Sequence, residues 1–184
     1  MPPHRRPLLP LLALLALLAL AVGVSACGYE ADSKEVEEGQ PVELGELHYN
    51  VTFSRYLNVN DPEDAAYLEG LPEAPKGSTY FGVFFEIQNE SDQVQPLPDT
   101  LTITDTEDKE YEVIEAEGIF ALPLGGEVEA EEQIPVLDSP AQLGAIEGSI
   151  AVFLLPEEAS EDRPLILHIP GAEDEEGGEV TLDL

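Results

Sequence analysis

The sequence predicts an all-β protein, in which about seven or eight strands form a sandwich of two antiparallel sheets. Apolar and polar residues alternate with a period of two along most of the chain after residue 45, which is typical of strands with one buried face. Turn-forming residues separate these runs at regular spacing. Since no amphipathic segment is long enough for a helix to cover a sheet, we expect a second sheet to do so.

The first two strands are the clearest. Residues 46–57 form one of them, and their apolar positions share a face, namely Leu47, Tyr49, Val51 and Phe53. The opposite face is polar, so this strand is expected to have one side in water. Residues 80–88 are apolar on both faces for part of their length, which suits a central strand.

A short helix is predicted between these two strands, over residues 61–70. Asp61 stands at the capping position, Pro62 at the first helical position and Gly70 at the end, with acidic residues in the first turn. We expect one or two helical turns in a crossover loop, outside the core.

Shorter apolar stripes predict the remaining strands, which are residues 101–104, 111–114, 128–136, 145–155, 165–169 and 180–184. A polar turn over residues 105–109 joins the first two of them as a hairpin. Glu132 interrupts the stripe at residues 128–136, so we expect an edge or a register shift there.

The N-terminal segment predicts the location of the protein. An apolar run of 17 residues, from Leu8 to Val24, follows Arg5 and Arg6 and ends in Val-Ser-Ala-Cys, with the single cysteine at Cys27. This pattern indicates a bacterial lipoprotein signal over residues 1–26, with a lipid attached to the Cys27 thiol after cleavage. An uncleaved membrane anchor is the alternative, because a transmembrane helix needs roughly 17–25 apolar residues. Both place the rest of the chain on the extracytoplasmic face of the cell membrane.

The charge of the mature chain limits its partners. Five basic residues remain after cleavage beside all 39 acidic residues, which gives a net charge of −34. Such a surface repels nucleic acid and anionic lipid. Divalent cations, cationic peptides and polyamines stay open as partners, as does a solvated acidic surface that keeps the protein soluble in a salty medium.

Residues 27–45 are rich in charge and poor in bulky apolar residues. They predict a disordered acidic tether that would hold a folded domain, residues 46–184, roughly 25 Å from the membrane.

Acidic loops suggest a calcium site, because calcium takes about six to eight oxygen ligands and needs no sulfur or nitrogen. The candidate ligands are Asp105, Glu107, Asp108 and Glu110 in the hairpin turn, with help from Asp61 and Asp64. None of these stretches matches an EF-hand loop, and Asp also opens turns and caps helices without any metal. No other cofactor is expected.

The sequence favours a protein without enzymatic activity. His48 and His168 are the only histidines of the mature chain, and neither lies near a motif such as a glycine-flanked serine. The chain has no tryptophan, whereas glycosidases usually carry aromatic sugar platforms beside their carboxylates.

The stretch Gly77 to Asp92, in which a glycine precedes a long apolar strand ending in Asn-x-Ser, resembles telokin-like, immunoglobulin-like extracytoplasmic lipoprotein domains. The hairpin from Thr102 to Tyr111 and the stretch Val152 to Pro156 resemble them too. The resemblance runs from about Leu44 to the C-terminus. It implies an immunoglobulin-like sandwich and an envelope location, and it transfers no catalytic residue because the family is largely uncharacterised.

These observations together predict a lipid-anchored binding or structural module of the bacterial cell envelope, whose contact surface is a sheet face or a set of loops. Its partner is an unknown envelope protein or a cationic ligand. The alternative is a calcium-binding lipoprotein that uses the acidic loops.

Overall fold

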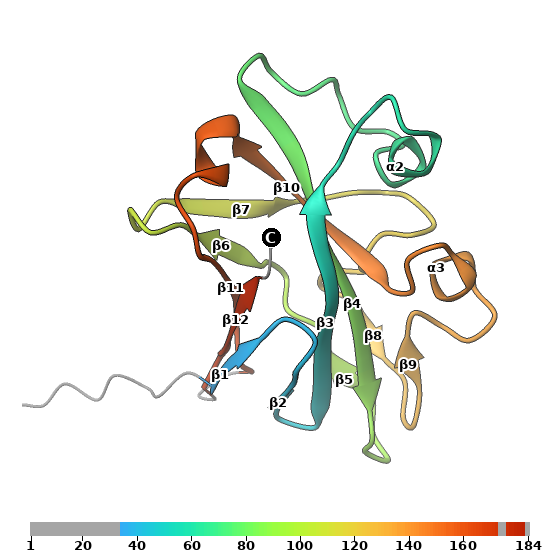
Figure 1. The fold of residues 1–184 in the computed structure, drawn as a ribbon. Coiled ribbons are helices and arrows are strands. Elements are labelled where there is room, and N and C mark those ends of the chain that lie inside the picture. Colours follow the sequence, from blue (N-terminus) through green and yellow to red (C-terminus); the bar gives the residue numbers. More distant parts are fainter. Residues whose placement is uncertain (1–33, 173–175, 183–184) are drawn as a thin grey trace, which may run out of the picture. The chain divides into compact units, whose positions relative to one another are not determined.

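The computed structural model describes residues 34–172 and 176–182, and these residues belong to one compact unit. Twelve strands, two α-helices and one 3₁₀ turn lie in the described part (Figure 1). The strands are β1 (Lys34–Glu37), β2 (Pro41–Leu44), β3 (Leu47–Tyr56), β4 (Ser78–Asn89), β5 (Gln95–Pro96), β6 (Thr102–Thr104), β7 (Glu110–Ile114), β8 (Glu127–Val128), β9 (Gln133–Ile134), β10 (Ser149–Pro156), β11 (Leu165–Ile169) and β12 (Gly178–Leu182). The helical segments are α2 (Pro62–Tyr67), α3 (Pro140–Leu143) and η1 (Glu157–Ser160).

Ten strands form one continuous sheet that folds over on itself. Its order is β1-β12-β11-β6-β7-β10-β4-β3-β2, with β9 beside β4, while β5 and β8 pair separately. In β7, Glu110–Glu112 pair with β6 and Val113–Ile114 pair with β10, so this strand joins the two layers. Figure 1 shows β3 and β4 crossing the centre, with β6, β11 and β12 on one side and both helices on the other.

The two ends of this sheet meet at the turn between β1 and β2. The Glu38 N–H donates to the Thr181 carbonyl on β12 at 2.9 Å, and the Gly39 N–H donates to the Val51 carbonyl on β3 at 2.7 Å. The sandwich is therefore nearly closed into a barrel, which leaves few free strand edges.

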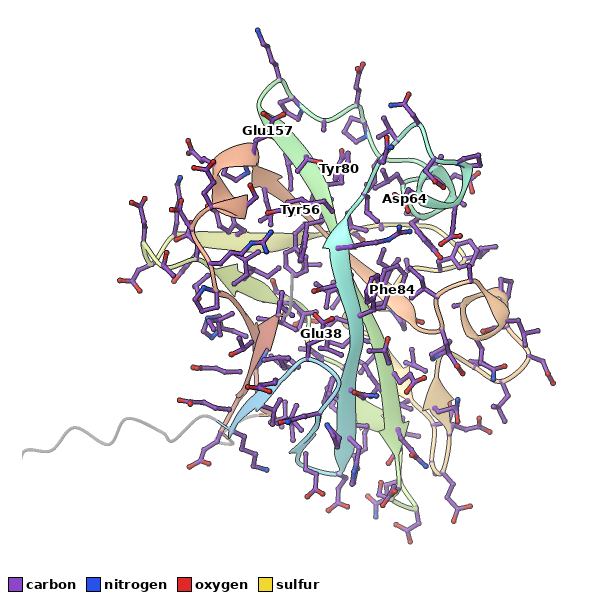
Figure 2. All side chains as sticks on the ribbon, in the orientation of Figure 1. Glu38, Tyr56, Asp64, Tyr80, Phe84 and Glu157 are labelled. Atoms are coloured by element: carbon purple, nitrogen blue, oxygen red, sulfur yellow. The ribbon has the colours of Figure 1, made fainter. Side chains whose placement is uncertain are left out.

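The main core lies between the two layers, where Phe81, Phe85, Phe153 and Leu167 are fully buried. A second apolar cluster covers the outer face of β4 and β10, and Figure 2 labels two of its members, Tyr80 and Phe84. Tyr67 of α2 packs there against Phe84 with ring centroids 5.2 Å apart. The structure is thus an all-β sandwich, as predicted, but it has two short helices where one was predicted. It has more strands than the predicted seven or eight.

The predicted tether over residues 27–45 is wrong for its second half, because β1 and β2 lie within it. Val42 and Leu44 are buried in the core, and Val36 packs against it. Glu35, Glu37 and Glu43 alternate with them on the exposed side. The acidic residues that suggested disorder therefore form the wet face of two four-residue strands, which were too short for their alternation to be recognised.

The predicted strand over 46–57 is confirmed as β3, but its C-terminal half is turned over. A bulge between Val51 and Phe53 shifts the register against β4, so Phe53 is exposed and Ser54 is buried, the reverse of the prediction. One extra residue in a strand moves every later side chain to the opposite face.

The helix predicted after Asp61 is confirmed as α2, and the Asp61 side chain accepts a hydrogen bond from the Glu63 N–H at 2.9 Å. The stripe over 128–136 splits into β8 and β9, which belong to different sheets. A turn separates them, in which Glu131 has a φ of 60° and the Glu132 N–H donates to the Glu129 carbonyl.

Candidate functional site

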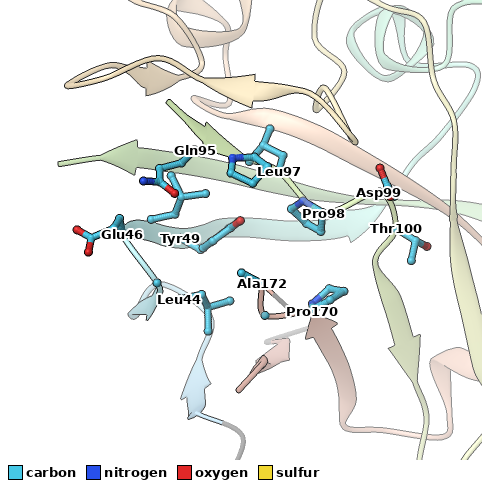
Figure 3. A pocket seen from close by; sticks show the side chains of 14 residues that line it. Leu44, Glu46, Tyr49, Gln95, Leu97, Pro98, Asp99, Thr100, Pro170 and Ala172 are labelled. Carbon is cyan, nitrogen blue, oxygen red and sulfur yellow. The ribbon is translucent and has the colours of Figure 1, made fainter. Parts of the chain in front are cut away.

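A pocket of about 500 Å³ opens beside the turn between β2 and β3, and we call it the β2–β3 pocket. Its walls come from this turn, from β3, from residues 95–100 and from the segment after β11 (Figure 3). The apolar part of the lining consists of Leu44, Leu47, Leu97, Pro96, Pro98, Pro170 and Ala172, and the polar side chains are Glu46, Tyr49, Gln95, Asp99 and Thr100.

Local backbone features hold these walls in place. Gly45 has a φ of 58° and allows the tight turn from β2 into β3. Pairing of Gln95 with Val128 and a hydrogen bond from the Leu97 N–H to the Gly126 carbonyl fix residues 95–97. Pro96 and Pro98 each have a fixed φ, which limits the freedom of this wall.

Tyr49 is the buried polar residue of the pocket. Only 4% of its surface is exposed, and its hydroxyl has no hydrogen-bond partner among the described residues. Figure 3 shows this hydroxyl pointing toward the space bounded by Pro98, Pro170 and Ala172. Burial raises the pKa of Tyr49 to about 12, so the phenol keeps its proton at neutral pH and can both donate and accept a hydrogen bond.

The charged residues that line the β2–β3 pocket are all acidic. Glu46 and Asp99 lie on its rim, and no Lys, Arg or His is among the residues that line it. An anionic ligand would find no counter-charge there. The lining therefore suits an uncharged or cationic organic molecule with an apolar body.

The carboxylate of Asp105, a predicted calcium ligand, is hydrogen-bonded within its own turn. It is 5% exposed, and its carboxylate accepts hydrogen bonds from the Glu107 N–H at 2.9 Å, the Lys109 N–H at 3.1 Å and the Tyr111 hydroxyl at 2.8 Å. Burial alone would raise the pKa of Asp105, but these hydrogen bonds, that from Tyr111 foremost, hold it below its usual range.

The other predicted calcium ligands are not brought together in the described part of the chain. Glu107, Asp108 and Glu110 are exposed around the hairpin turn. Asp61 caps α2, while the buried Asp64 accepts hydrogen bonds from the Arg55 guanidinium and from the Asn58 N–H. Figure 1 shows α2 and the β6–β7 turn on opposite sides of β3.

Within residues 34–172 and 176–182 no group of three or more His, Cys, Asp or Glu side chains could hold a metal ion. The calcium site stays a prediction.

The two histidines also lie apart. His48 on β3 is 3.7 Å from the Glu90 carboxylate, and His168 on β11 is 3.6 Å from that of Glu179 and 2.7 Å from the Thr104 hydroxyl. Both are partly exposed on outward-facing positions of their strands, beside polar neighbours as the alternation indicated.

The signal segment, Cys27 and the first part of the tether lie outside the described residues, so the lipidation site stays a prediction. In the part that is described, no helix has the length and apolar character to cross a membrane.

Sequence reasoning missed the β2–β3 pocket. The alternation assigns Tyr49 to the buried face of its predicted strand, and no prediction from the sequence covers Pro96 or Pro98. The alternation of Gln95-Pro-Leu-Pro indicates a rigid extended segment, but the side of the protein on which it lies depends on its pairing with β8.

Comparisons with known proteins place the fold and not the function. No family model matches the chain, and no curated protein matches it either. Several solved structures are similar. The yjhA protein from Bacillus subtilis is 12% identical, with a TM-score of 0.52, and the similarity covers 80% of this chain and 99% of that one.

A functionally unknown protein from Listeria monocytogenes EGD-e is 9% identical, with a TM-score of 0.51 and coverage of 80% and 83%. An uncharacterised β-sandwich protein from Clostridium difficile 630 is 15% identical, with a TM-score of 0.47 and coverage of 83% and 95%. The chain thus has a fold similar to those of the Bacillus subtilis and Listeria monocytogenes proteins, and these similarities do not single out the telokin-like domains.

Proposed function

We propose that this protein is a lipid-anchored, non-catalytic binding module on the extracytoplasmic face of a bacterial cell membrane. The anchor would be the lipid on Cys27, as the Val-Ser-Ala-Cys sequence after the apolar run indicates. The resemblance of residues 77–92 to telokin-like, immunoglobulin-like extracytoplasmic lipoprotein domains supports the same assignment.

The single observation that carries the binding role is the Tyr49 hydroxyl. A buried polar group is normally hydrogen-bonded within its protein, because leaving it without a partner costs stability. Most of Tyr49 is buried, but its hydroxyl is not sealed inside the protein: it faces the β2–β3 pocket, and no described residue is hydrogen-bonded to it. A ligand in this pocket would supply the missing hydrogen bond.

The ligand proposed from the lining is a small organic molecule, uncharged or cationic, with an apolar body. Leucine and proline side chains would contact the body, and the Tyr49 hydroxyl would bind one polar atom. A rim with Glu46 and Asp99 but without basic residues would disfavour anions.

Catalysis is not part of this proposal. The polar lining offers no histidine, cysteine or serine as nucleophile or base. The high pKa of Tyr49 also makes its phenolate scarce at neutral pH.

Fractionation of cells tests the anchor. Replacing Cys27→Ser should move the protein from the membrane fraction to the soluble extracytoplasmic fraction and abolish labelling by a fatty-acid probe. A Ser25→Thr variant leaves the cysteine in place and serves as the control. A Cys27→Ser protein that is still lipidated would exclude Cys27 as the site.

Native mass spectrometry of protein purified from its own envelope tests the pocket. We expect a bound small molecule in the wild type and its loss in Thr100→Trp, which places an indole at the pocket mouth. Thr106→Trp makes the same change in the exposed β6–β7 turn and should retain the molecule. A molecule that survives Thr100→Trp would show that it binds elsewhere.

A further inference from the structure

The four most exposed large apolar side chains of the described residues lie in two segments of the chain. Ile119 is 69% exposed, Leu143 68%, Val136 61% and Leu137 60%. We call these four residues the α3 face, because three of them lie in α3 or directly before it and the fourth lies in the adjoining loop.

The two segments adjoin each other. Gly144, next to Leu143, would bring a β-carbon to 3.9 Å from the Phe120 ring, which follows Ile119. The Phe120 ring itself packs against Tyr67 with centroids 5.1 Å apart. The loop that carries Ile119 therefore lies next to the C-terminal end of α3, where Leu143 is exposed.

Hydrogen bonds hold both segments in place. The Ser139 hydroxyl caps α3, the Gly148 N–H donates to the Ala141 carbonyl at 3.0 Å, and the Ile150 N–H donates to the Phe120 carbonyl at 2.7 Å. The apolar side chains are thus presented by a fixed backbone, and their exposure is a property of the fold.

A groove of about 490 Å³ borders this face on the outer side of β3 and β4. Leu137 and Gln142 form its edge toward α3, while Glu86 and Glu147 contribute carboxylates. No Lys or Arg is among the residues that line the groove, and His48 is its one basic side chain. Apolar anchors and carboxylates therefore stand side by side.

The charge of this region decides which partner fits. The chain carries no Lys, Arg or His from residue 110 to residue 162, the stretch that contains the whole α3 face, whereas acidic residues are frequent in it. A second copy would bring two acidic faces together, and an anionic lipid surface would be repelled as well. A basic partner is attracted.

We propose that the α3 face and the adjoining groove dock a basic amphipathic segment of another envelope protein. Its apolar side chains would pack on Ile119, Leu137 and Leu143, and its lysine or arginine side chains would lie along Glu86 and Glu147. This docking surface is separate from the β2–β3 pocket and does not depend on a ligand there.

A defined peptide pair tests the proposal. The protein is the mature chain, residues 27–184, with Cys27→Ser so that no detergent is needed. The probes are two labelled peptides of six lysines and six leucines, one with an amphipathic order and one with a scrambled order. Fluorescence anisotropy at 150 mM salt should show at least tenfold tighter binding of the amphipathic peptide.

Two double variants with unchanged net charge separate docking from general attraction. Ile119→Ser with Leu143→Ser should weaken binding about tenfold. Val59→Ser with Val94→Ser, which changes exposed apolar residues elsewhere, should leave it unaltered. Glu86→Gln with Glu147→Gln should also weaken binding and flatten its salt dependence.

The proposal is overturned if both serine pairs weaken binding of the amphipathic peptide to the same extent. It is equally overturned if the amphipathic and the scrambled peptide bind with the same affinity. It is also overturned if sedimentation shows a dimer that Leu143→Ser dissociates, because the face would then bind a second copy. All replaced positions of the serine pairs are exposed, so thermal melting should confirm that each variant is folded.

Discussion

Asp105 and Tyr49 are two polar side chains that are almost equally buried, yet their surroundings are opposite. The Asp105 carboxylate accepts hydrogen bonds from two backbone N–H groups and from the Tyr111 hydroxyl. The Tyr49 hydroxyl has no hydrogen-bond partner among the described residues and opens onto the β2–β3 pocket. The Asp105 carboxylate is already hydrogen-bonded within the protein, whereas the Tyr49 hydroxyl is available to a ligand.

This difference shows that an acidic side chain can serve its own turn instead of a ligand. In a turn, an aspartate satisfies the free N–H groups of its own backbone, and Asp105 does so. A polar group that faces a pocket without such partners is the more informative sign of binding.

The largest expected effect is that of Asp105→Asn. Removing the charge weakens three hydrogen bonds at a buried position, and we expect a loss of roughly 2–3 kcal/mol in the free energy of unfolding. Urea denaturation measures it. Glu107→Gln, at an exposed position of the same turn, should change stability by less than about 0.5 kcal/mol. Equal effects of the two substitutions would show that the Asp105 hydrogen bonds do not stabilise the turn.

The lowered pKa of Asp105 predicts that the effect of Asp105→Asn on the free energy of unfolding depends on pH. Because the pKa of Asp105 is lowered in the folded state from its ordinary value of 3.8, its carboxylate stabilises the fold above pH 3.8. This stabilisation is lost as the pH falls through the folded-state pKa. The difference in unfolding free energy between wild type and Asp105→Asn should therefore shrink below pH 3.8. A difference that stays constant down to pH 2 would contradict the lowered pKa.

Tyr111→Phe should have a smaller effect on the same turn. It removes one hydrogen bond to the Asp105 carboxylate and leaves both backbone donors in place, so we expect a loss of roughly 1–2 kcal/mol. In the double variant with Asp105→Asn the two losses should fall short of additivity, since the residues are in contact. Full additivity would mean that the Tyr111 hydroxyl does not act through Asp105.

Tyr49→Phe should have the smallest effect on stability, within about 0.5 kcal/mol, because no hydrogen bond within the described protein is lost. Alkaline titration of the phenol absorbance should lose the group that ionises at about pH 12. Tyr49→Phe should therefore destabilise the protein less than Tyr111→Phe does. A Tyr49→Phe loss as large as that of Tyr111→Phe would mean that the Tyr49 hydroxyl is bonded within the protein.

Much of the fold could be predicted from the sequence, because alternation is a local consequence of burying one face of a strand. β3, β4 and β10 were recognised in this way, and α2 was recognised from its cap and proline. Strands β5, β8 and β9 have two residues each, too few to show a period. The alternation of the sequence does not reveal the bulge after Val51. Because of this bulge, Phe53 is exposed and Ser54 is buried.

The candidate sites were the less predictable part. Asp105 was noticed for its charge, but its role depends on donors that only the closed turn brings to it. The α3 face was missed because Ile119 is separated by about twenty residues from the other three, and apolar residues in a sequence are first assumed to be buried.

The sequence by itself determined the β class, the positions of the long strands, the capped helix and the acidic charge, since each depends on near neighbours along the chain. The lipid anchor is a prediction from the same local pattern. Only the tertiary structure decided that β1 and β2 close the sandwich, that the Tyr49 hydroxyl faces a pocket without a partner among the described residues and that the α3 face is exposed beside carboxylates. These features depend on which distant segments meet, and that choice is made by packing of the whole domain.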